Sequence, residues 1–567
     1  MIRRVRAMVR SRMAGLRGFL GRRRSLRVGA ALVRDVPFLL PRHPRLALAI
    51  ARAGRAKDPA LLRLLDRALR VRRTPRLLRR RARILAAIGE PTAERDVWLE
   101  LAKAGDAEAG SRARVLTGRL TETDPSWLPR LEGASERLEP LDRRRILHIT
   151  KSSVPERWSG FTIRTLQNMR AQRGAGLEPI LVTEIGWPRV AGVSDVAPVV
   201  VHEGFEHHRL DRGPGYDLAG TPNDVRLQDT AEAMAAIVRA VRPSILHAHS
   251  GYRGGDQALV ALALRERFGI PVVYEVRGLF EAVWADDPVM AERSELYARR
   301  LAQETRIMHA ADGVIAISDA LADELSSRGI PRDKITIVPN GIDIEALGRP
   351  VRDPALRASL GFEDRFVVGY LGNLDHWREG IGILIDAVAE LREQGRDDIA
   401  ILVVGDGTRR EQYEAHAGRL GLADRTRFTG RVPHEFVGQY YAQMDLFVNP
   451  RLDERASRYI TPIKPYEAMA IGLPVLVSDL PALREIVDAP QRGLVAPPGD
   501  ASELAAAIAR LADDPELRQR LGLAGQDWVR AERTWASNGA RYLAAYEAII
   551  GPIDVGAAAG DAMGSDR

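Results

Sequence analysis

The feature that most constrains this chain is an alternation of short apolar runs with helical segments, which begins at Arg145. The first series of β-rich runs is RILHIT, PILVTEI, ILHAHS, PVVYEVR, GVIAIS and ITIVPN. Segments with helical periodicity, such as DTAEAMAAIVRAV and GGDQALVALALRERFG, separate several of these runs. This order is typical of βαβ units, and it predicts a parallel sheet that is covered on both faces.

A second series of the same kind starts at Phe366, with the runs FVVGYLG, IAILVVGDG, TRFTGRV, LFVNP, PVLVSD and LVAPPG. We therefore expect an α/β fold with two successive doubly wound domains, over residues 145–342 and 343–534, that face a cleft. In sheets of this kind, ligands bind beyond the carboxyl ends of the strands. The last residues, 553–567, are predicted to form a disordered tail.

Residues 1–140 have a different texture, in which Leu, Ala and Arg dominate and apolar residues recur at three- and four-residue spacing. This predicts an α-helical region. Residues 1–100 hold 27 Lys and Arg against 7 Asp and Glu, although the whole chain carries only +9. The basic character therefore belongs to this region, and the remainder of the chain is net acidic.

Three interpretations of the basic region stay open. Its first 30 residues could form an amphipathic helix that lies on an anionic membrane surface. Residues 1–100 would then be the part of the chain that contacts the membrane. The first 30 residues could instead be a solvated Arg-rich leader. Nucleic acid is the least favoured partner, because no aromatic residues are interleaved with the cations. The leader has no continuous apolar core, so it is not a secretory signal, and no stretch approaches the roughly 18–20 apolar residues that span a bilayer.

The chain contains no cysteine, which excludes a disulfide framework, a thiolate metal site and a cysteine nucleophile. That composition fits a reducing compartment. We expect a cytoplasmic protein, peripheral on the inner face of the plasma membrane if the basic region binds lipid.

The stretch SRYITPIKPYEAMAIGLPVLVSD places Lys464 three residues before Glu467, at the predicted start of a short helix capped by Thr461. Residues three apart share one helix face. A helix N-terminus reinforced by Lys464 suits a phosphate or diphosphate, and Glu467 could accept hydrogen bonds from the hydroxyls of a ribose. The alternative is an ion pair that only closes the helix end.

Two glycine-containing turns support the nucleotide interpretation. GYLGNLDHWREG, residues 369–380, follows the first strand of the second series and supplies Gly372, Asn373, Arg378 and Glu379. VVGDG ends at the turn that begins with Gly405. Such turns let the backbone approach a phosphate closely.

The ordered set VPNGID, GYLGN…EG, LVVGDG, FTGRVPHE and TPIKPYEAMAIGLPVLVSD resembles the GT-B retaining glycosyltransferases of family 4. SGFTIRT, LHAHS, YEVRGLFE and NPRLDERASRYITPIKPYEAMA resemble the exosortase-associated, exopolysaccharide-type branch. The resemblance covers roughly residues 145–550. It implies transfer of a sugar from a UDP- or GDP-sugar to a saccharide acceptor that is free or lipid-linked, and a helix near 535–552 that completes the first domain.

The resemblance also implies roles for individual residues. Lys464, Arg378 and Arg277 are the catalytic candidates. The donor-binding candidates are Glu467, Thr461, Gly372, Asn373, Glu379, Gly405, Arg431, Val432 and Gly160. The acceptor-binding candidates are Arg164, His249 and Glu281.

The chain departs from the family pattern at three places. In the phosphate loop many members have G-R-L…K-G and this chain has GNLDHWREG, so Arg378 or Lys464 must supply the cation. Tyr459 stands where many members have a glutamate that contacts the sugar, and Arg277 stands where many have a histidine. No D-x-D metal dyad is present, and the acidic pair at 286–287 is interpreted as a loop. We expect no metal and no cofactor, because Lys, Arg and N–H groups would neutralise the leaving diphosphate. The resemblance implies retention of the anomeric configuration.

Other functions remain as alternatives. A degenerate scaffold could bind a sugar nucleotide or glycan without turnover, and a two-domain nucleotide-sugar epimerase would share the same texture. A dinucleotide-dependent dehydrogenase is disfavoured, because RILHIT leads into KSSVPERWSG and not into G-x-G-x-x-G.

Overall fold

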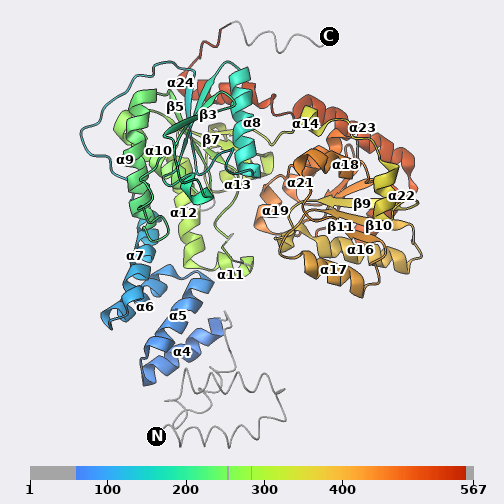
Figure 1. Cartoon of the computed structure of the whole chain (residues 1–567), viewed down its shortest axis with the longest axis horizontal. Coiled ribbons are helices and arrows are strands. Elements are labelled where there is room, and N and C mark those ends of the chain that lie inside the picture. Colours follow the sequence, from blue (N-terminus) through green and yellow to red (C-terminus); the bar gives the residue numbers. More distant parts are fainter. Residues whose placement is uncertain (1–58, 252–253, 283, 286, 557–567) are drawn as a thin grey trace, which may run out of the picture. The chain divides into compact units, whose positions relative to one another are not determined.

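The computed structural model describes residues 59–251, 254–282, 284–285 and 287–556 (Figure 1). By its internal contacts, the chain divides into two compact units. Among the described residues, the helical unit comprises 59–130, 213–231, 280–282, 284–285 and 287–306. The sheet unit comprises 131–212, 232–251, 254–279 and 307–556. The amphipathic helix predicted for the first 30 residues lies outside the described residues, and so does the end of the predicted tail. Within the described residues, no helix combines the length and the apolar character needed to cross a bilayer.

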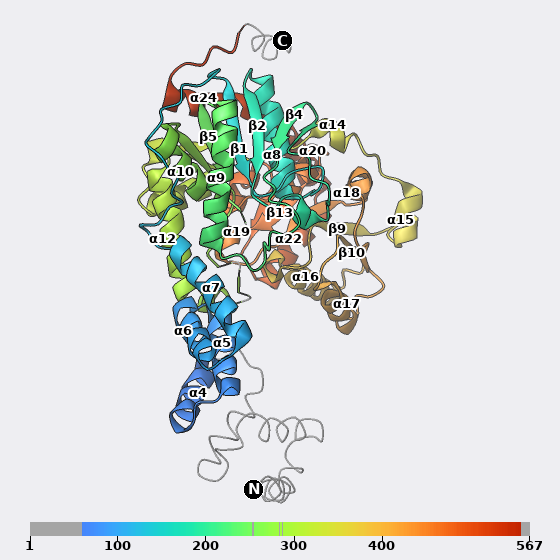
Figure 2. The ribbon, with the colours of Figure 1, turned by 60° about the vertical axis from the view of Figure 1, so that its left-hand side comes forward.

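The helical unit contains a series of consecutive helices that pack against their neighbours in sequence (Figure 2). Their apolar residues, such as Leu65, Leu85 and Leu101, form one core. Thr74 caps α5 by accepting a hydrogen bond from the backbone N–H of Leu77. The bounds are α4 Pro59–Val71, α5 Pro75–Ile88, α6 Pro91–Lys103, α7 Ala107–Glu122 and α11 Pro288–Glu292.

Two segments within the predicted first α/β domain belong to the helical unit by their contacts. Gln303 donates a hydrogen bond to the carbonyl of Glu122 at 2.6 Å. Glu295 accepts hydrogen bonds from the backbone N–H and the hydroxyl of Thr92 at 3.0 and 2.5 Å. Residues 213–231 and 280–306 therefore interrupt the continuous domain that the sequence predicted over 145–342.

The first sheet of the sheet unit has eight strands in the order β3-β4-β2-β1-β5-β6-β7-β8. All neighbours are parallel except β3 and β4. The strand bounds are β1 Arg145–Thr150, β2 Glu178–Thr183, β3 Val199–His202, β4 Phe205–His208, β5 Ile245–His249, β6 Val272–Val276, β7 Gly313–Ala316 and β8 Ile335–Ile337. The helices that accompany it are α8 Gly160–Gly174, η2 Arg189–Ala191, α10 Asp256–Phe268, α13 Asp319–Ser327, η3 Arg332–Lys334 and α24 Asn538–Ile550. Helices α9 Asn223–Val241 and α12 Glu295–Ala310 each have residues in both units.

The second sheet has six parallel strands in the order β11-β10-β9-β12-β13-β14. The strand bounds are β9 Phe366–Leu371, β10 Ile399–Val404, β11 Thr426–Phe428, β12 Leu446–Asn449, β13 Val475–Ser478 and β14 Leu494–Ala496. The helices are α14 Ile344–Leu347, α15 Pro354–Leu360, η4 Trp377–Glu379, α16 Ile381–Glu393, α17 Arg410–Arg419, η5 His434–Phe436, α18 Val437–Tyr441, α19 Arg455–Tyr459, α20 Lys464–Ala470, α21 Pro481–Val487, α22 Ala501–Asp513 and α23 Pro515–Glu532.

Each face of the second sheet has its own apolar core, because consecutive strand residues point to opposite faces. Val367 packs in one core with Tyr466 and Leu483, while Val368 packs in the other with Leu384 and other residues. The prediction of two α/β domains with parallel sheets, preceded by helices, is therefore confirmed.

Helix α24 follows the last strand of the first sheet by about 200 residues in sequence, and the second sheet lies between them in the chain. It nevertheless packs on the first sheet. Tyr542 and Tyr546 are fully buried in a core with Ile146 and Ile245. Ile553 joins the same core and is only 5% exposed. The prediction that the tail begins at residue 553 is wrong, because this side chain is anchored in the core.

Gly380 ends the turn after β9, and the geometry there predicts that no other residue fits. Its φ is +73°, and an added Cβ would lie 1.8 Å from the carbonyl oxygen of Pro450. Gly380→Ala should destabilise the protein by about 2 kcal/mol or more, which lowers the melting temperature by about 2 °C or more. Gly382→Ala is the matched control, because a Cβ at Gly382 in α16 meets nothing within 4 Å. Equal melting temperatures of the two variants in calorimetry would contradict this reasoning.

Candidate functional site

In each sheet, successive strands are added first on one side of the first strand and then on the other. The candidate residues lie near this reversal point of the strand order. In the second sheet this point lies between β9 and β12, which are neighbours although two other strands lie between them in sequence. The turn 372–380 follows β9, the turn 405–407 follows β10, and residues 450–463 connect β12 to α20. Ligands of doubly wound sheets bind at such points, beyond the carboxyl ends of the strands.

Lys464 and Glu467 share one helix face and form an ion pair, as the alternative interpretation of their spacing expected, and donor binding by the pair stays a prediction. Lys464 Nζ lies 2.9 Å from both carboxylate oxygens of Glu467. The buried Tyr441 hydroxyl donates a further hydrogen bond to Glu467 Oε2 at 2.9 Å. The Lys464 side chain is 31% exposed and that of Glu467 13% exposed, so the pair is partly open to solvent. Burial, followed by the Glu467 carboxylate, holds the pKa of Tyr441 well above its ordinary value, so Tyr441 acts as a donor.

Thr461 does not cap this helix, which corrects the prediction. The residue before α20 is Ile463, whose φ of −78° and ψ of −30° are already helical, and no side chain caps the first turn. Thr461 lies two residues before Ile463 and is 3% exposed. Its carbonyl oxygen accepts a hydrogen bond from Asn340 Nδ2 at 3.0 Å. The first-turn N–H groups of α20 therefore have no side-chain cap.

The turns after β9 and β10 pack directly against one another. The backbone N–H of Gly372 donates to the carbonyl of Val404 at 3.0 Å, and that of Leu374 donates to the carbonyl of Asp406 at 3.0 Å. A Cβ at Gly405 would lie 1.9 Å from the carbonyl oxygen of Gly372, so the fold itself requires this glycine. Asn373 is exposed, and its side-chain oxygen accepts a hydrogen bond from the N–H of Asp375 at 2.6 Å.

Glu379 is buried and fully engaged inside the protein. Arg451 Nε donates to Glu379 Oε2 at 3.1 Å, and the Tyr370 hydroxyl donates to the same oxygen at 3.2 Å. Burial alone would raise the pKa of Glu379, but the Arg451 charge, helped by Arg378 and Tyr370, holds it below its ordinary value. Arg378 is 26% exposed and lies 3.8 Å from Glu379 and 3.7 Å from Glu454.

Arg431 and Val432 follow β11 and lie at the same edge of the second sheet. Gly430, directly before them, forms an isolated bridge with Gly405 in the turn after β10. Arg431 is exposed, while Val432 is half-buried against one of the two cores of this sheet. Their position is compatible with a role in base binding, which stays a prediction.

The first sheet carries a pocket at its own reversal point, between β1 and β5. The empty space beside its lining residues is about 560 Å³, a figure that includes open solvent. Thr150 ends β1, His249 ends β5, and Arg277 follows β6. The lining residues are Thr150, Lys151, Ser152, Arg157, Ser159, Phe161, Thr165, His249, Ser250, Gly251 and Arg277. Gly160, between two of them, is exposed, and a Cβ there would meet nothing within 4 Å.

Below the pocket, Glu275 gathers several side chains although it is itself completely buried. Arg277 Nε and Arg164 Nε donate to Glu275 Oε1 at 2.7 and 2.9 Å. The Tyr542 hydroxyl donates to Glu275 Oε2 at 2.8 Å, and His247 Nε2 lies 3.1 Å from that oxygen. Burial alone would raise the pKa of Glu275, but the two arginines hold it well below its ordinary value. The carboxylate is therefore ionised.

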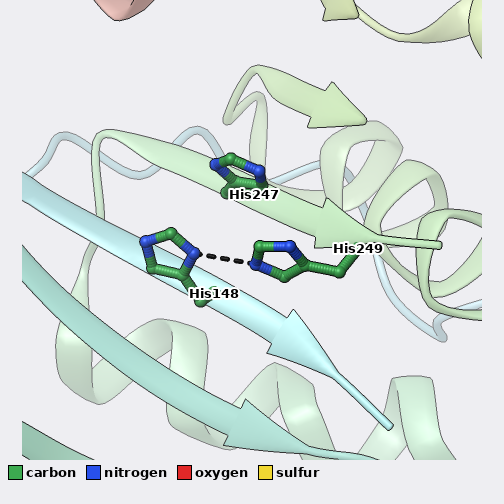
Figure 3. A group of neighbouring side chains, drawn as sticks. All are labelled: His148, His247 and His249. Atoms are coloured by element: carbon green, nitrogen blue, oxygen red, sulfur yellow. Dashed lines mark hydrogen bonds between the residues drawn. The ribbon is translucent and has the colours of Figure 1, made fainter. Parts of the chain in front are cut away.

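Three histidines from two neighbouring strands stack beside this carboxylate (Figure 3). His148 Nδ1 and His249 Nε2 share a hydrogen bond at 2.9 Å, and His148 Nε2 lies 2.9 Å from Gln172 Oε1. His247 Nδ1 bonds the Tyr546 hydroxyl at 2.6 Å. Within the described residues, these rings are the one His, Asp and Glu group close enough together to suggest a metal site. Because five of their six nitrogens already have partners in the protein, the group fits a hydrogen-bonded stack better than a set of metal ligands.

The acceptor candidates lie in different surroundings. His249 lines the pocket, together with the catalytic candidate Arg277. Arg164 is 3% exposed, and its remaining donors bind the carbonyls of Val338 and Pro339, so it is occupied within the protein. Glu281 is buried and belongs to the helical unit.

Sequence reasoning missed the central role of Glu275 and its contact with Tyr542. The available signal was a single acidic residue inside the apolar strand PVVYEVR, which must be paired when it is buried.

Acid should destabilise the protein through the histidine stack. Burial, followed by nearby charges, holds the pKa of His148 and His249 well below 6.5, and burial also lowers the pKa of His247. The unfolded chain therefore takes up protons first as pH falls below about 6.5, which costs up to about 1.4 kcal/mol per histidine per pH unit. We expect the melting temperature to fall between pH 7 and 5.

His249→Gln should reduce this pH dependence, and His416→Gln, at a half-exposed position in α17, is the control. Burial raises the pKa of Glu485 to about 7, which acts in the opposite sense over the same range. The measured quantity is therefore the difference between variant and parent in the melting-temperature change from pH 7 to pH 5. An unchanged pH dependence in His249→Gln would refute the neutral, buried assignment of the stack.

Comparison with known proteins identifies the family to which this fold belongs. The family described as Glycosyltransferase Family 4 matches residues 159–346, and that described as Glycosyl transferases group 1 matches residues 365–514. The alpha-D-kanosaminyltransferase of Streptomyces kanamyceticus is 29% identical over 49% of this chain and 70% of its own. The GDP-mannose-dependent alpha-mannosyltransferase of Mycolicibacterium smegmatis is 27% identical over 72% of this chain and 98% of its own.

Among solved structures, Anabaena HepE in complex with UDP superposes with a TM-score of 0.56 at 18% identity, over 71% of this chain and 100% of its own, which shows a shared fold. The two family matches follow one another along the chain, one on each sheet, and together they span more than half of it. The chain therefore belongs to the group 1, family 4 glycosyltransferases of the GT-B fold.

Proposed function

We propose that this protein transfers a sugar from a UDP- or GDP-sugar to a saccharide acceptor, with retention of the anomeric configuration. The observation that carries the proposal is the partly exposed Lys464–Glu467 pair at the reversal point of the second sheet. The Mycolicibacterium relative is named for GDP-mannose, and HepE was solved with UDP, which supports these two carriers. The resemblance to the exopolysaccharide-type branch supports a role in cell-surface or exopolysaccharide biosynthesis.

The Lys464–Glu467 pair has unused capacity for the donor. An ammonium group has three N–H donors, and two of those of Lys464 are directed to the Glu467 oxygens. The third can donate to a diphosphate oxygen. A carboxylate offers about four lone-pair positions, so Glu467 can also accept hydrogen bonds from a ribose diol while the Tyr441 hydroxyl holds it in place.

In the proposed reaction, the bond between the anomeric carbon and the diphosphate oxygen breaks as an acceptor hydroxyl attacks from the same face. The new bond joins the anomeric carbon to the acceptor oxygen, and the hydroxyl proton passes to the leaving diphosphate. Lys464 and Arg378 would stabilise the charge that develops on the diphosphate, which is where electrostatic stabilisation contributes most. No metal or cofactor is required by this scheme.

The acceptor would bind in the pocket of the first sheet, against His249 and Arg277. If that acceptor is lipid-linked, the basic residues 1–100 would hold the enzyme at the anionic inner face of the plasma membrane and raise the local concentration of substrate. Residues 1–58 of that region lie outside the described residues.

A sugar-nucleotide or glycan-binding protein without turnover is the second candidate, and Tyr459 favours it. This residue replaces the glutamate that contacts the sugar in many relatives. Its ring lies 5.9 Å from the Arg455 guanidinium carbon, and burial, followed by the Glu324 charge, raises its pKa. Tyr459 therefore supplies no carboxylate at that position.

Substitution of the Lys464–Glu467 pair tests both candidates. Lys464→Ala should lower the release of free nucleoside diphosphate from UDP- or GDP-sugars by about 10²-fold, because one donor to the developing charge is lost. Glu467→Gln should weaken nucleotide binding about tenfold, because a charge-assisted acceptor is lost.

Arg396→Ala is the control, since its partly exposed pair with Asp398 precedes β10 at the opposite edge of the sheet. Nucleotide binding is measured by calorimetry and turnover by the nucleoside diphosphate released with a panel of acceptors. Wild-type turnover in both pair variants would refute the site. Donor binding without turnover across the panel would favour the second candidate.

A further inference from the structure

The pocket of the first sheet has the lining of an anion site. Lys151, Arg157 and Arg277 contribute cations, and the hydroxyls of Thr150, Ser152, Ser159, Thr165 and Ser250 surround them. Among the described residues that line it, none carries a carboxylate. Positive charge therefore faces the space inside the pocket without acidic side chains in its wall.

The floor of the pocket holds three polar atoms that lack hydrogen-bond partners. They are Thr150 Oγ1, His249 Nδ1 and Arg277 Nη2, from residues that are 4%, 3% and 6% exposed. The three residues lie at the ends of β1, β5 and β6, which are adjacent in the sheet. Buried polar groups in folded proteins are almost always hydrogen-bonded. His249 Nδ1 lies 3.7 Å from Glu275 Oε2 below the floor, so the two remaining groups, Thr150 Oγ1 and Arg277 Nη2, are the ones that indicate a polar ligand.

The charges below the floor are also unbalanced. Arg164 and Arg277 share the single carboxylate of Glu275, and the other donors of Arg164 bind neutral oxygens. The histidines beside them are neutral, because burial lowers the pKa of all three rings. One positive charge thus remains without a partner in a buried region, where an uncompensated charge is costly. An anion in the pocket would compensate it.

We propose that this pocket binds a phosphate group carried by the acceptor. A phosphate has more acceptor oxygens than a carboxylate and up to two negative charges, which matches three cations and several hydroxyls better. Ser250 illustrates the fit: its hydroxyl oxygen accepts the backbone N–H of Arg277 at 2.9 Å, so its own O–H can donate to the ligand. Thr165 anchors Arg277 Nη1 at 2.8 Å and so fixes the guanidinium at the floor.

Arg277 Nη2 lies just beneath the pocket surface and not on it. A small rotation of the guanidinium, or one bridging water, brings it into contact with a phosphate oxygen. Lys151 and Arg157 then approach the phosphate from the rim. The inference rests on the proposed function only in identifying the ligand as the acceptor, because the anion site itself follows from the pocket alone.

The test uses probes that differ at one position. Binding of inorganic phosphate, glucose 6-phosphate, glucuronate and glucose to the full chain is measured by calorimetry, with and without saturating UDP or GDP. We expect glucose 6-phosphate to bind at least about tenfold more tightly than glucose and more tightly than glucuronate. Saturation with UDP or GDP should leave the binding of phosphate intact.

Two variants locate the binding. Arg157→Gln changes an exposed side chain and should weaken the binding of inorganic phosphate about tenfold. Arg277→Lys keeps the charge but removes the forked donor, and should have a similar effect. Arg396→Gln is the matched control and should bind as the parent does. If Arg277→Lys does not fold, Arg157→Gln and the probe series still decide the question.

Equal binding of glucose and glucose 6-phosphate, a preference for glucuronate, or unchanged phosphate binding in Arg157→Gln would each overturn the proposal. Displacement of phosphate by UDP or GDP would also overturn it, because the phosphate would then occupy the donor site. If the parent chain binds neither UDP nor GDP but still shows Arg157-dependent phosphate binding, the proposed function is refuted. The anion site is then still supported.

Discussion

The buried carboxylate of Glu275 is the interaction on which the architecture of the first sheet depends. It receives hydrogen bonds from Arg164 on α8, Arg277 after β6 and Tyr542 on α24. Arg164 and Tyr542 come from segments that are 111 and 267 residues away from Glu275, so one charged group joins distant parts of the chain. Removing one partner of a buried charge pair costs about 3–5 kcal/mol, because the remaining charge is left uncompensated. The position of the pocket floor and the docking of the C-terminal helix thus depend on the same charge.

The same network reaches the segment between the two sheets. Arg164 donates to the carbonyls of Val338 and Pro339, at 2.7 and 2.9 Å, directly before the chain leaves the first sheet. The returning chain runs beside it, since Ile342 N donates to the carbonyl of Arg533 at 2.8 Å. The guanidinium that balances Glu275 therefore also fixes the path of the connection. This explains why Arg164 is buried although its position at the start of α8 suggested a ligand contact.

Local patterns in the sequence predicted both sheets and every strand except β3 and β4, and they placed Lys464 and Glu467 on one helix face, because apolar runs and an i,i+3 spacing act over a few residues. They did not predict the partners of Glu275, which lie 111 and 267 residues away for Arg164 and Tyr542. Long-range partners depend on strand order, which spacing does not encode. The helix cap failed for a local reason: Ile463 already has helical angles, so Thr461 is too early in the chain. Gly405 was correctly noticed, yet contact with the neighbouring turn is enough to require it.

The two sheets differ in how their cations are balanced, and this difference has a consequence for the proposed reaction. At the second sheet, Lys464 faces Glu467 and Arg451 faces Glu379, one carboxylate for each cation. A diphosphate that arrives there meets an ammonium whose charge Glu467 already balances, and it can use only the third N–H donor of Lys464. The same carboxylate would accept hydrogen bonds from the ribose diol. Recognition of the diphosphate and of the ribose would then be coupled through one ion pair, so an isolated phosphate should gain little from this site.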